Sequence, residues 1–328
     1  MMPWVDLRSS GVRVTRLVLG TAPLGGLFEP VSDEDADATF EAAWAAGIRA
    51  FDTAPHYGVG LAERRLGSFL ASRPRSSYVV STKVGRLLVP SPGPGPVDGV
   101  EGFYGTPCLS RVWDFSADGV RRSLADSLER LGLDRVDLVL IHDPDDPEHA
   151  RQALDSGYPA LRQLRSDGVI GAIGIGMNQV SVPSWFVARA DLDCVLIAGR
   201  YSLLDSSAGL ELLPLCAERG VAVLVGGVFN SGILADPAPG ASYDYRPAPA
   251  DLVERARRIR AVCAGYGLPI GAAALAFVLR NPAVTAALVG ARTAAEIAED
   301  VGYLARPVPD ELFAELSAVG LLPDGAGS

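Results

Sequence analysis

Lysine is almost absent from this chain. Of its 29 basic residues only Lys83 is a lysine, and all the others are arginines. An arginine side chain keeps its proton, whereas the pKa of a lysine shifts readily when the side chain is buried. Arginine therefore serves wherever a general positive charge suffices, and the single lysine indicates a position with a chemical task. The alternative is that one lysine has survived by chance in an arginine-rich chain.

Metal-binding cysteine pairs, membrane-length apolar runs and excess positive charge are also missing. Four cysteines, Cys108, Cys194, Cys216 and Cys263, are far apart and have no metal-ligand spacing, so we expect structural thiols. No apolar run approaches the ~20 residues that cross a bilayer, and the first residues lack the layout of a signal peptide. A formal net charge of −10 repels nucleic acid. We expect a cytoplasmic protein that acts on a small molecule, and its oligomeric state stays open.

Strand-like and helix-like patterns alternate along the whole sequence. This alternation predicts an α/β fold in which helices cover a parallel sheet. No strand–turn–helix segment carries Gly-x-Gly-x-x-Gly, and the string Gly171 to Gly176 has a different spacing, so a doubly wound dinucleotide-binding sheet is excluded. Eight apolar strand-like runs are each followed by a helical pattern. The first run ends near residues 19–21, and the others lie at 48–51, 78–82, 136–141, 170–175, 194–197, 221–225 and 286–289.

Eight is the number of strands that closes a (β/α)8 TIM barrel. We therefore predict a single barrel domain over residues 1–328, with a short N-terminal β segment and a flexible tail over about residues 320–328. Two segments, residues 89–105 and 236–249, are rich in proline and glycine and follow strands. Because such segments surround the C-terminal mouth of a barrel, we predict long substrate-selecting loops there, within residues 86–115 and 227–250.

Four side chains capable of proton chemistry fall at successive strand ends. Asp52 ends the second strand and is followed by Tyr57, while Lys83 ends the third strand and His142 the fourth. Consecutive strand ends are neighbours on a barrel rim, so these groups are expected to converge. A nearby ammonium lowers the pKa of a phenol, and Asp52 would keep Lys83 charged. Tyr57 is then a usable general acid or base, with His142 orienting the substrate oxygen or sharing the proton.

These motifs resemble the aldo-keto reductase family. The matching strings are Asp-Thr-Ala-x-x-Tyr-Gly at residues 52–58, Ser-Thr-Lys at 81–83 and Leu-Ile-His at 140–142, and the resemblance covers essentially the whole chain. It implies a (β/α)8 barrel that binds NAD(P)(H) across its mouth and transfers a hydride to or from a carbonyl carbon without a metal. It also implies that the catalytic residues are Asp52, Tyr57, Lys83 and His142.

Within that family the chain is similar to the D-threo-aldose 1-dehydrogenase group, which includes L-fucose dehydrogenase-like proteins. The supporting strings lie at residues 20–26, 141–146, 198–205 and 226–232. The resemblance implies oxidation of the anomeric hydroxyl of an aldose to a lactone, with Tyr57 as general base. A pyridoxal 4-dehydrogenase or a general aldehyde or ketone reductase is the alternative. A non-catalytic cofactor-sensing subunit and a metal-dependent barrel isomerase are alternatives of other classes.

The resemblance also implies which residues hold the cofactor. Backbone groups at residues 229–232 are expected to wrap the pyrophosphate, and the N-terminus of the last helix favours phosphate. Glu296 would repel the 2′-phosphate of NADP, whereas Arg292 suits a phosphate, so we expect NAD or NADP with a preference for NAD. The expected cofactor-binding residues are Gly20, Thr21, Asn178, Phe229, Ser231, Gly290, Arg292, Glu296 and Asp300.

Three residues are expected to contact the substrate, namely His56, Trp113 and Arg200. Departures from the family pattern affect the nicotinamide contacts, because Ala198 aligns near a family glutamine and Gly226 aligns with an aromatic residue. Arg200 is expected to replace that glutamine or to touch the substrate. The acidic loop after His142 contains four residues of types that can bind metals, namely Asp143, Asp145, Asp146 and His149. Because prolines interrupt their spacing, we predict no metal site there.

Overall fold

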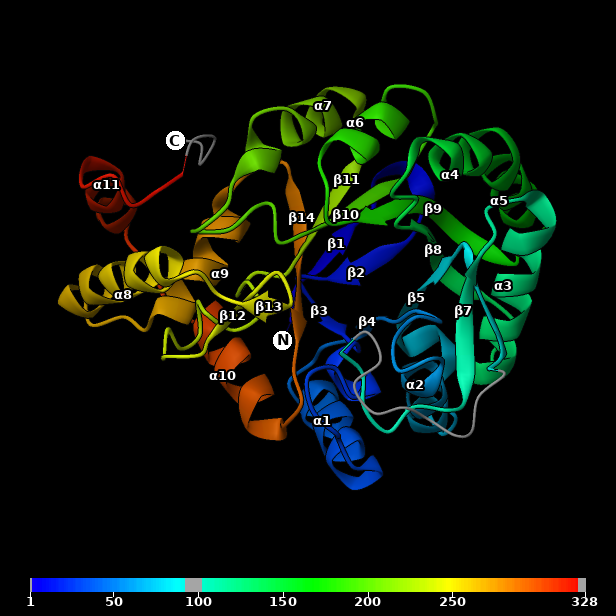
Figure 1. Cartoon of the computed structure of the whole chain (residues 1–328), viewed down its shortest axis with the longest axis horizontal. Helices are drawn as coiled ribbons and strands as arrows, with labels where there is room; N and C mark the ends of the chain where they lie inside the picture. Colours follow the sequence, from blue (N-terminus) through cyan, green and yellow to red (C-terminus); the bar gives the residue numbers. More distant parts are fainter. Residues whose placement is uncertain (1, 92–101, 324–328) are drawn as a thin grey trace.

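Eight parallel strands close into a barrel in the computed structural model, which describes residues 2–91 and 102–323. The strands are β3 (Leu17–Gly20), β4 (Ala50–Asp52), β5 (Val79–Val84), β8 (Val136–His142), β9 (Ile170–Met177), β10 (Cys194–Ala198), β11 (Ala222–Gly226) and β14 (Val284–Gly290). They follow the order β10-β11-β14-β3-β4-β5-β8-β9 around the barrel (Figure 1). The predicted (β/α)8 architecture is therefore confirmed.

Helices surround the barrel on the outside (Figure 1). Serine side chains begin two of them, since Ser32 Oγ and Ser116 Oγ each accept a hydrogen bond of 3.0 Å from a backbone N–H of the first turn. The helices are α1 (Asp33–Ala45), α2 (Leu61–Leu70), α3 (Ala117–Leu131), α4 (Pro147–Gln152), α5 (Tyr158–Ser166), α6 (Ser181–Val187), α7 (Leu212–Arg219), α8 (Ala250–Gly265), α9 (Ile270–Arg280), α10 (Ala294–Leu304) and α11 (Asp310–Ala318).

The two predicted long loops contain short antiparallel ladders. In the first loop β6 (Arg86–Pro90) pairs with β7 (Leu109–Trp113), and in the second β12 (Ser242–Tyr243) pairs with β13 (Arg246–Pro247). The prediction described these segments as loops and missed both ladders. Most of the Pro/Gly-rich part of the first loop, residues 92–101, lies outside the described residues.

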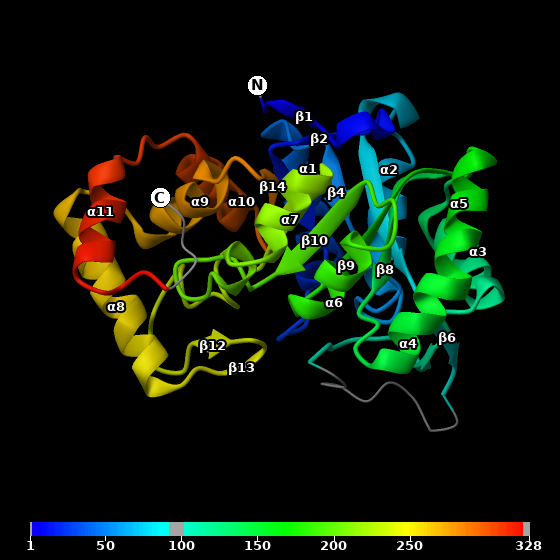
Figure 2. The same cartoon turned by 90° about the horizontal axis from the view of Figure 1, so that it is seen from above.

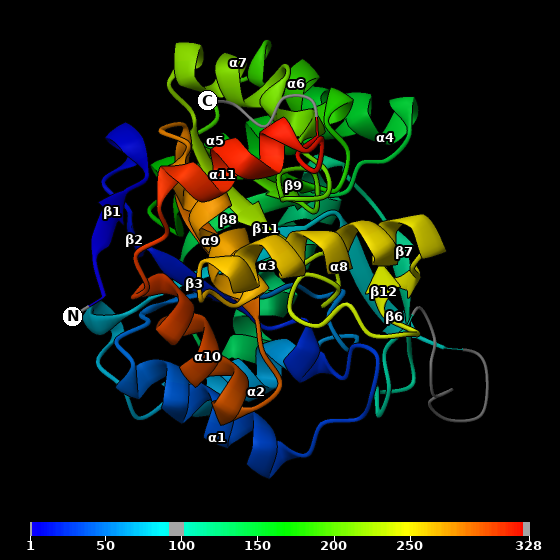
Figure 3. The ribbon, with the colours of Figure 1, turned by 90° about the vertical axis from the view of Figure 1, so that its left-hand side faces the viewer.

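An N-terminal hairpin covers the end of the barrel opposite the predicted long loops, and a short N-terminal β segment was predicted. Its strands are β1 (Trp4–Asp6) and β2 (Arg13–Thr15). Figures 2 and 3 place this hairpin at one end of the molecule and β12 at the other. Leu7 and Val14 of the hairpin segment join the barrel interior, where small and branched side chains of the strands leave a packed core rather than a pore.

Irregular turns adjoin two of the outer helices. A π-helical turn (Ala153–Gly157) joins α4 to α5 in one longer run. A 3-10 turn at Ser207–Gly209 precedes α7, which begins at Leu212. Helix α11 was not predicted, and the predicted tail over residues 320–328 lies beyond the described residues from 324 onward.

Helices α8 and α9 are consecutive helices of the outer layer. No single helix in residues 2–91 and 102–323 is long and apolar enough to cross a bilayer. These two helices reach the required length and composition only when taken together, and a bend of 93° separates them. Helix α9 is mostly buried against its neighbours, including α10 and β14, which explains its apolar composition.

Candidate active site

Asp52 and Lys83 form a buried ion pair at the ends of adjacent strands β4 and β5. Lys83 Nζ lies 2.6 Å from Asp52 Oδ2, and each side chain is only 1% exposed. Ser81 Oγ donates a hydrogen bond to the other carboxylate oxygen, and Lys83 Nζ also donates to the backbone oxygen of Thr53 at 2.9 Å. Burial alone lowers the pKa of Lys83, but Asp52 and Tyr57 together raise it above its usual value. The only lysine of the chain is therefore charged and fixed in position.

Tyr57 lies directly against this lysine. The Lys83 ammonium is 4.5 Å from the centre of the Tyr57 ring, and a hydrogen bond to Lys83 stabilises the phenolate. Burial nevertheless raises the pKa of Tyr57 more than Lys83 lowers it, so the net direction is upward. The predicted lowering by the ammonium has the right sign, but the prediction omitted burial and was wrong about the net result.

His142, at the end of β8, completes the predicted set. Its ring centre lies 6.0 Å from that of Tyr57 and 5.7 Å from that of His56. Burial, with Arg86 and Lys83 nearby, lowers the pKa of His142 well below its usual value. The same causes, with burial the largest, lower the pKa of His56 to about 2. Both imidazoles are therefore neutral near pH 7, and His142 can act as a hydrogen-bond donor without carrying charge.

A second ion pair adjoins His142 and was not predicted as part of the site. Arg86 Nη2 donates a 2.6 Å hydrogen bond to Asp143 Oδ2, and the same oxygen lies 3.3 Å from His142 Nε2. The Arg86 side chain is 6% exposed and that of Asp143 is 21% exposed. Burial raises the pKa of Asp143 to about 6, even though Arg86 opposes the shift. Only the position of Asp143 directly after His142 could have signalled this pair in the sequence.

Aromatic rings line the mouth around these charged groups. Phe103 lies 5.3 Å from His56 and 6.4 Å from Tyr57, measured between ring centres. The predicted substrate residue Trp113 is 39% exposed, and the Arg86 guanidinium lies 5.3 Å from its ring centre. His56 and Trp113 therefore reach the same mouth as the four predicted catalytic residues.

Arg200, which was predicted to replace the family glutamine or to touch the substrate, is hydrogen-bonded to three partners at the barrel rim. Its Nε donates to the backbone oxygen of Asn178 at 2.8 Å, and its two Nη atoms donate to Asp205 at 2.9 Å and to Asp244 at 2.5 Å. These three partners come from the loops after β9, after β10 and between β12 and β13. Because one of these partners, Asp244, lies between β12 and β13, Arg200 links the β12–β13 ladder to the barrel rim.

The β12–β13 ladder reaches across the mouth through Tyr245. The rings of Tyr245 and Phe28 are stacked with centres 6.0 Å apart, although Phe28 belongs to the loop after β3. The predicted cofactor residue Ser231 accepts a hydrogen bond of 3.2 Å at Oγ from the backbone N–H of Tyr245. Phe229 is half-buried and packs against Tyr303 of α10. The segment at 229–245 thus forms a strap between α10 and the β3 loop.

The rim between β14 and β3 has features that suit a dinucleotide. Thr21 Oγ1 and Asn230 Oδ1 are buried, and neither has a hydrogen-bond partner within the described part of the chain. Gly20 and Gly290 are paired across the two strands. A Cβ atom added to Gly226 would have its nearest neighbour at 3.6 Å, an ordinary van der Waals distance. The absence of a side chain therefore leaves space beside Gly226 that a ligand can fill. These residues fit a flat, polar cofactor lying along the rim.

Acidic groups surround the start of α10. Glu296 Oε2 accepts a 2.6 Å hydrogen bond from the backbone N–H of Arg292, and the Arg292 guanidinium is shared between Glu296 and Glu29. Burial is the main cause that raises the pKa of Asp300 to about 8, and Glu296 adds to it. Arg292 is therefore already paired with two carboxylates in this structure.

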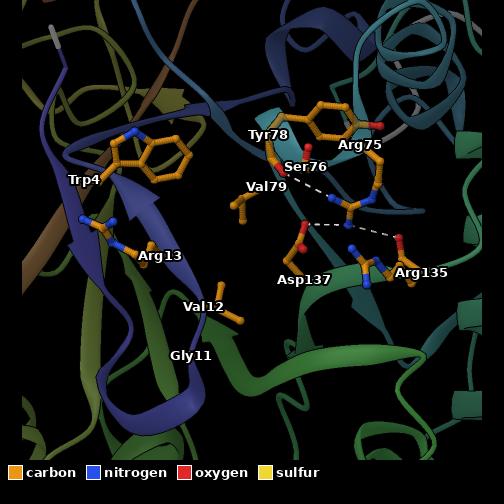
Figure 4. Close-up of a pocket in the computed structure, with 10 residues that line it drawn as sticks. All are labelled: Trp4, Gly11, Val12, Arg13, Arg75, Ser76, Tyr78, Val79, Arg135 and Asp137. Atoms are coloured by element: carbon orange, nitrogen blue, oxygen red, sulfur yellow. Dashed lines mark hydrogen bonds and ion pairs between the residues drawn. The ribbon is translucent and has the colours of Figure 1, made fainter.

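A separate groove lies at the other end of the barrel, where β5 and β8 begin. Its volume is about 340 Å³, and Figure 4 shows Arg75 bridging Tyr78 and Asp137 within it. Trp4 of the N-terminal hairpin also lines it, so it is remote from Tyr57 and Lys83. Within the described ranges no group of three or more His, Cys, Asp or Glu side chains is placed to hold a metal ion.

The barrel and the groups at its mouth define a class of enzyme, the NAD(P)-dependent oxidoreductases built on a (β/α)8 fold. The chain belongs to the Aldo/keto reductase family, whose sequence profile matches residues 16–320. It resembles a solved aldo-keto reductase from Bacillus halodurans, with a TM-score of 0.77 and 26% identity over 98% of this chain and 97% of the other.

Particular relatives narrow the comparison. The chain is 44% identical to a D-threo-aldose 1-dehydrogenase from a Pseudomonas species, over 96% of this chain and 97% of the relative. It is 42% identical to a pyridoxal 4-dehydrogenase from Microbacterium luteolum, with the same coverage of both chains. It is also 33% identical to an L-galactose dehydrogenase from Arabidopsis thaliana, over 92% of this chain and 88% of the relative. Two of these three names specify sugar oxidation.

Proposed function

We propose that this protein oxidises the anomeric hydroxyl of an aldose, of the L-fucose or D-threo type, to a lactone with NAD(P)⁺. The observation that carries the proposal is the contact of Tyr57 with the buried Asp52–Lys83 pair, open toward His142. The names of the 44% and 33% identical relatives favour a sugar as the substrate. The combination of carboxylate, arginine and aromatic side chains around the mouth suits a ligand with several hydroxyl groups.

Each of the four residues has one task in this proposal. Tyr57, as the phenolate, takes the proton from the anomeric hydroxyl as the carbon–oxygen double bond of the lactone forms. Lys83 stabilises the phenolate electrostatically, and Asp52 holds Lys83 in the charged state. The neutral His142 donates a hydrogen bond that orients the reacting oxygen. NAD(P)⁺, held by residues such as Thr21 and Asn230, would supply the hydride acceptor for this oxidation.

The cofactor is expected to lie along the rim formed by β14, β3 and the strap. Thr21, Asn230 and the backbone of Phe229 and Ser231 would hold its polar groups, and Gly226 leaves room for the flat ring. We propose a preference for NAD, because Glu296 and Glu29 already neutralise Arg292 and would repel an added 2′-phosphate. Gly20 and Gly290 lie on the same rim. Asn178 follows β9 and is linked to the strap through Arg200.

Reduction of NAD⁺ and NADP⁺ by purified protein tests this proposal, with L-fucose, L-galactose, D-arabinose and pyridoxal as substrates. Turnover of a sugar together with lactone formation supports an aldose 1-dehydrogenase. Turnover of pyridoxal alone would replace the proposal by a pyridoxal 4-dehydrogenase, which the 42% identical relative favours. Cofactor binding without turnover of any carbonyl or alcohol would instead point to a cofactor-sensing subunit.

A further inference from the structure

Asp143 is held at the catalytic mouth by an unusual backbone conformation. Its φ angle is +46°, in the left-handed region that side chains other than glycine rarely adopt, and its backbone N–H donates a 3.1 Å hydrogen bond to Gly176. This conformation places the carboxylate beside His142 rather than in the solvated loop that follows. At 21% exposure the side chain is shielded but still reachable from the mouth.

The contacts of Asp143 leave part of its carboxylate available. Arg86 at 2.6 Å and His142 at 3.3 Å both approach the same oxygen, Oδ2. A carboxylate has a second oxygen with its own acceptor sites, so Oδ1 can accept from a ligand. Arg86 fixes the orientation of the carboxylate and is itself placed over the exposed ring of Trp113. A charged acceptor and an apolar ring therefore face the same space.

We propose that Asp143 is a specificity-determining residue that accepts a hydrogen bond from the substrate hydroxyl on the carbon next to the reacting carbon. The inference rests on the proposed function, in which the reacting oxygen lies between Tyr57 and His142. Because Asp143 Oδ2 is 3.3 Å from His142 Nε2, a hydroxyl on the neighbouring carbon comes within reach of this carboxylate. The substrate class is thereby narrowed to sugars and other molecules with hydroxyls on adjacent carbons.

A carboxylate is well suited to this selection. Hydrogen bonds to an ionised acceptor are stronger than neutral ones, and a site built to bind a substrate hydroxyl discriminates against an analogue that lacks it. Burial raises the pKa of Asp143 to about 6, so the group is mostly ionised at neutral pH. Without a substrate hydroxyl, the shielded charge is left with fewer partners than its two oxygens can accept.

The test compares D-arabinose with 2-deoxy-D-ribose, the same pentose without its C2 hydroxyl, in the wild type and in Asp143→Asn. Asparagine tolerates the left-handed backbone of Asp143, and its amide oxygen can still accept from Arg86, so the fold should be retained. Cofactor affinity, measured by fluorescence, checks this. Asp145→Asn, an exposed position in the same loop, is the matched control for loss of one negative charge.

We expect Asp143→Asn to lower kcat/KM for D-arabinose about 10- to 100-fold and that for 2-deoxy-D-ribose less than about threefold. Asp145→Asn should leave both values within about twofold. Equal losses on the two sugars would overturn the inference, since Asp143 would then act only by positioning His142. Unchanged values on both sugars would overturn it as well. A wild type that oxidises neither of these sugars, nor L-fucose or L-galactose, would instead overturn the proposed function on which the inference rests.

Discussion

Lys83 Nζ lies 2.6 Å from Asp52 Oδ2, and each of the two side chains is only 1% exposed. Removing one member of a buried pair leaves an uncompensated charge, which typically costs about 3–5 kcal/mol. We therefore expect Lys83→Met to lower the free energy of unfolding by about that amount, as measured by urea denaturation. The double variant Asp52→Asn/Lys83→Met should recover much of this loss.

Variants of the same pair distinguish an effect on stability from an effect on catalysis. Activity should be lost in Lys83→Met and should not return in the double variant, because Tyr57 still lacks its ammonium. Lys83→Arg keeps the charge but presents it in a larger planar group, so its activity should also be low. Recovery of activity in the double variant would contradict an electrostatic role for Lys83.

Tyr57→Phe removes the proposed base and little else. We expect kcat to fall by about 10²- to 10⁴-fold, the usual contribution of a positioned acid or base. The affinity for NAD⁺, measured by fluorescence titration, should change less than about twofold, because the hydroxyl lies against Lys83 and not along the cofactor rim. A variant with near-normal turnover would show that another group takes the proton.

The rate of sugar oxidation should rise with pH through and beyond neutrality. Burial raises the pKa of Tyr57, so the phenolate is the minor form near pH 7 and its fraction grows about tenfold per pH unit below that pKa. The reverse reduction, which needs the phenol, should fall at high pH. Since His142 and His56 have lowered pKa values, neither should give an inflection between pH 6 and 8. Initial rates in both directions check this, and an oxidation rate that falls above pH 7 would contradict it.

The sequence allowed the fold and the four central residues to be predicted for the same physical reason. Apolar runs mark strands buried on both faces, and a barrel brings successive strand ends to one rim. The Arg86–Asp143 pair was not predictable, since it depends on the path of β6 after Lys83. The net pKa of Tyr57 was missed because the sequence does not reveal how strongly the phenol is desolvated.

Long-range loop contacts were equally invisible. Tyr245 stacks on Phe28, which is more than 200 residues earlier in the sequence. Arg200 donates hydrogen bonds to both Asp205 and Asp244, which belong to different loops. Neither contact leaves a periodic pattern in the sequence. Arg200 was predicted to replace a family glutamine or to touch the substrate, and its contact with Asp244 of the strap was missed.

Asp244→Asn should loosen that strap. Replacing the carboxylate weakens its charge-assisted hydrogen bond of 2.5 Å with Arg200, so the β12–β13 ladder should open more often. We expect NADH to dissociate about 3- to 10-fold faster in stopped-flow measurements, with little change in melting temperature. Asp236→Asn is the matched control, because its partner Arg260 is 50% exposed and the pair is 3.3 Å apart. Equal release rates in the wild type and both variants would rule out the strap role.

Glu296→Gln tests cofactor preference. Glutamine can still accept the hydrogen bond from the backbone N–H of Arg292, while the negative charge is removed. We expect kcat/KM for NADP⁺ to rise about 3- to 10-fold and that for NAD⁺ to stay within about twofold. Glu254→Gln on α8 controls for net charge. If NADP⁺ use is unaffected, Glu296 does not set the preference.

The most direct test of the central claim is hydride transfer from a sugar deuterated at its anomeric carbon, followed by mass analysis of the nicotinamide and the sugar product. The account predicts that deuterium moves to the reduced nicotinamide and that the sugar becomes a lactone in the wild type. In Tyr57→Phe both products should form at least about 100-fold more slowly. Reduced nicotinamide without deuterium, or equal rates in the two proteins, would contradict the assignment of Tyr57 and its partners to anomeric oxidation.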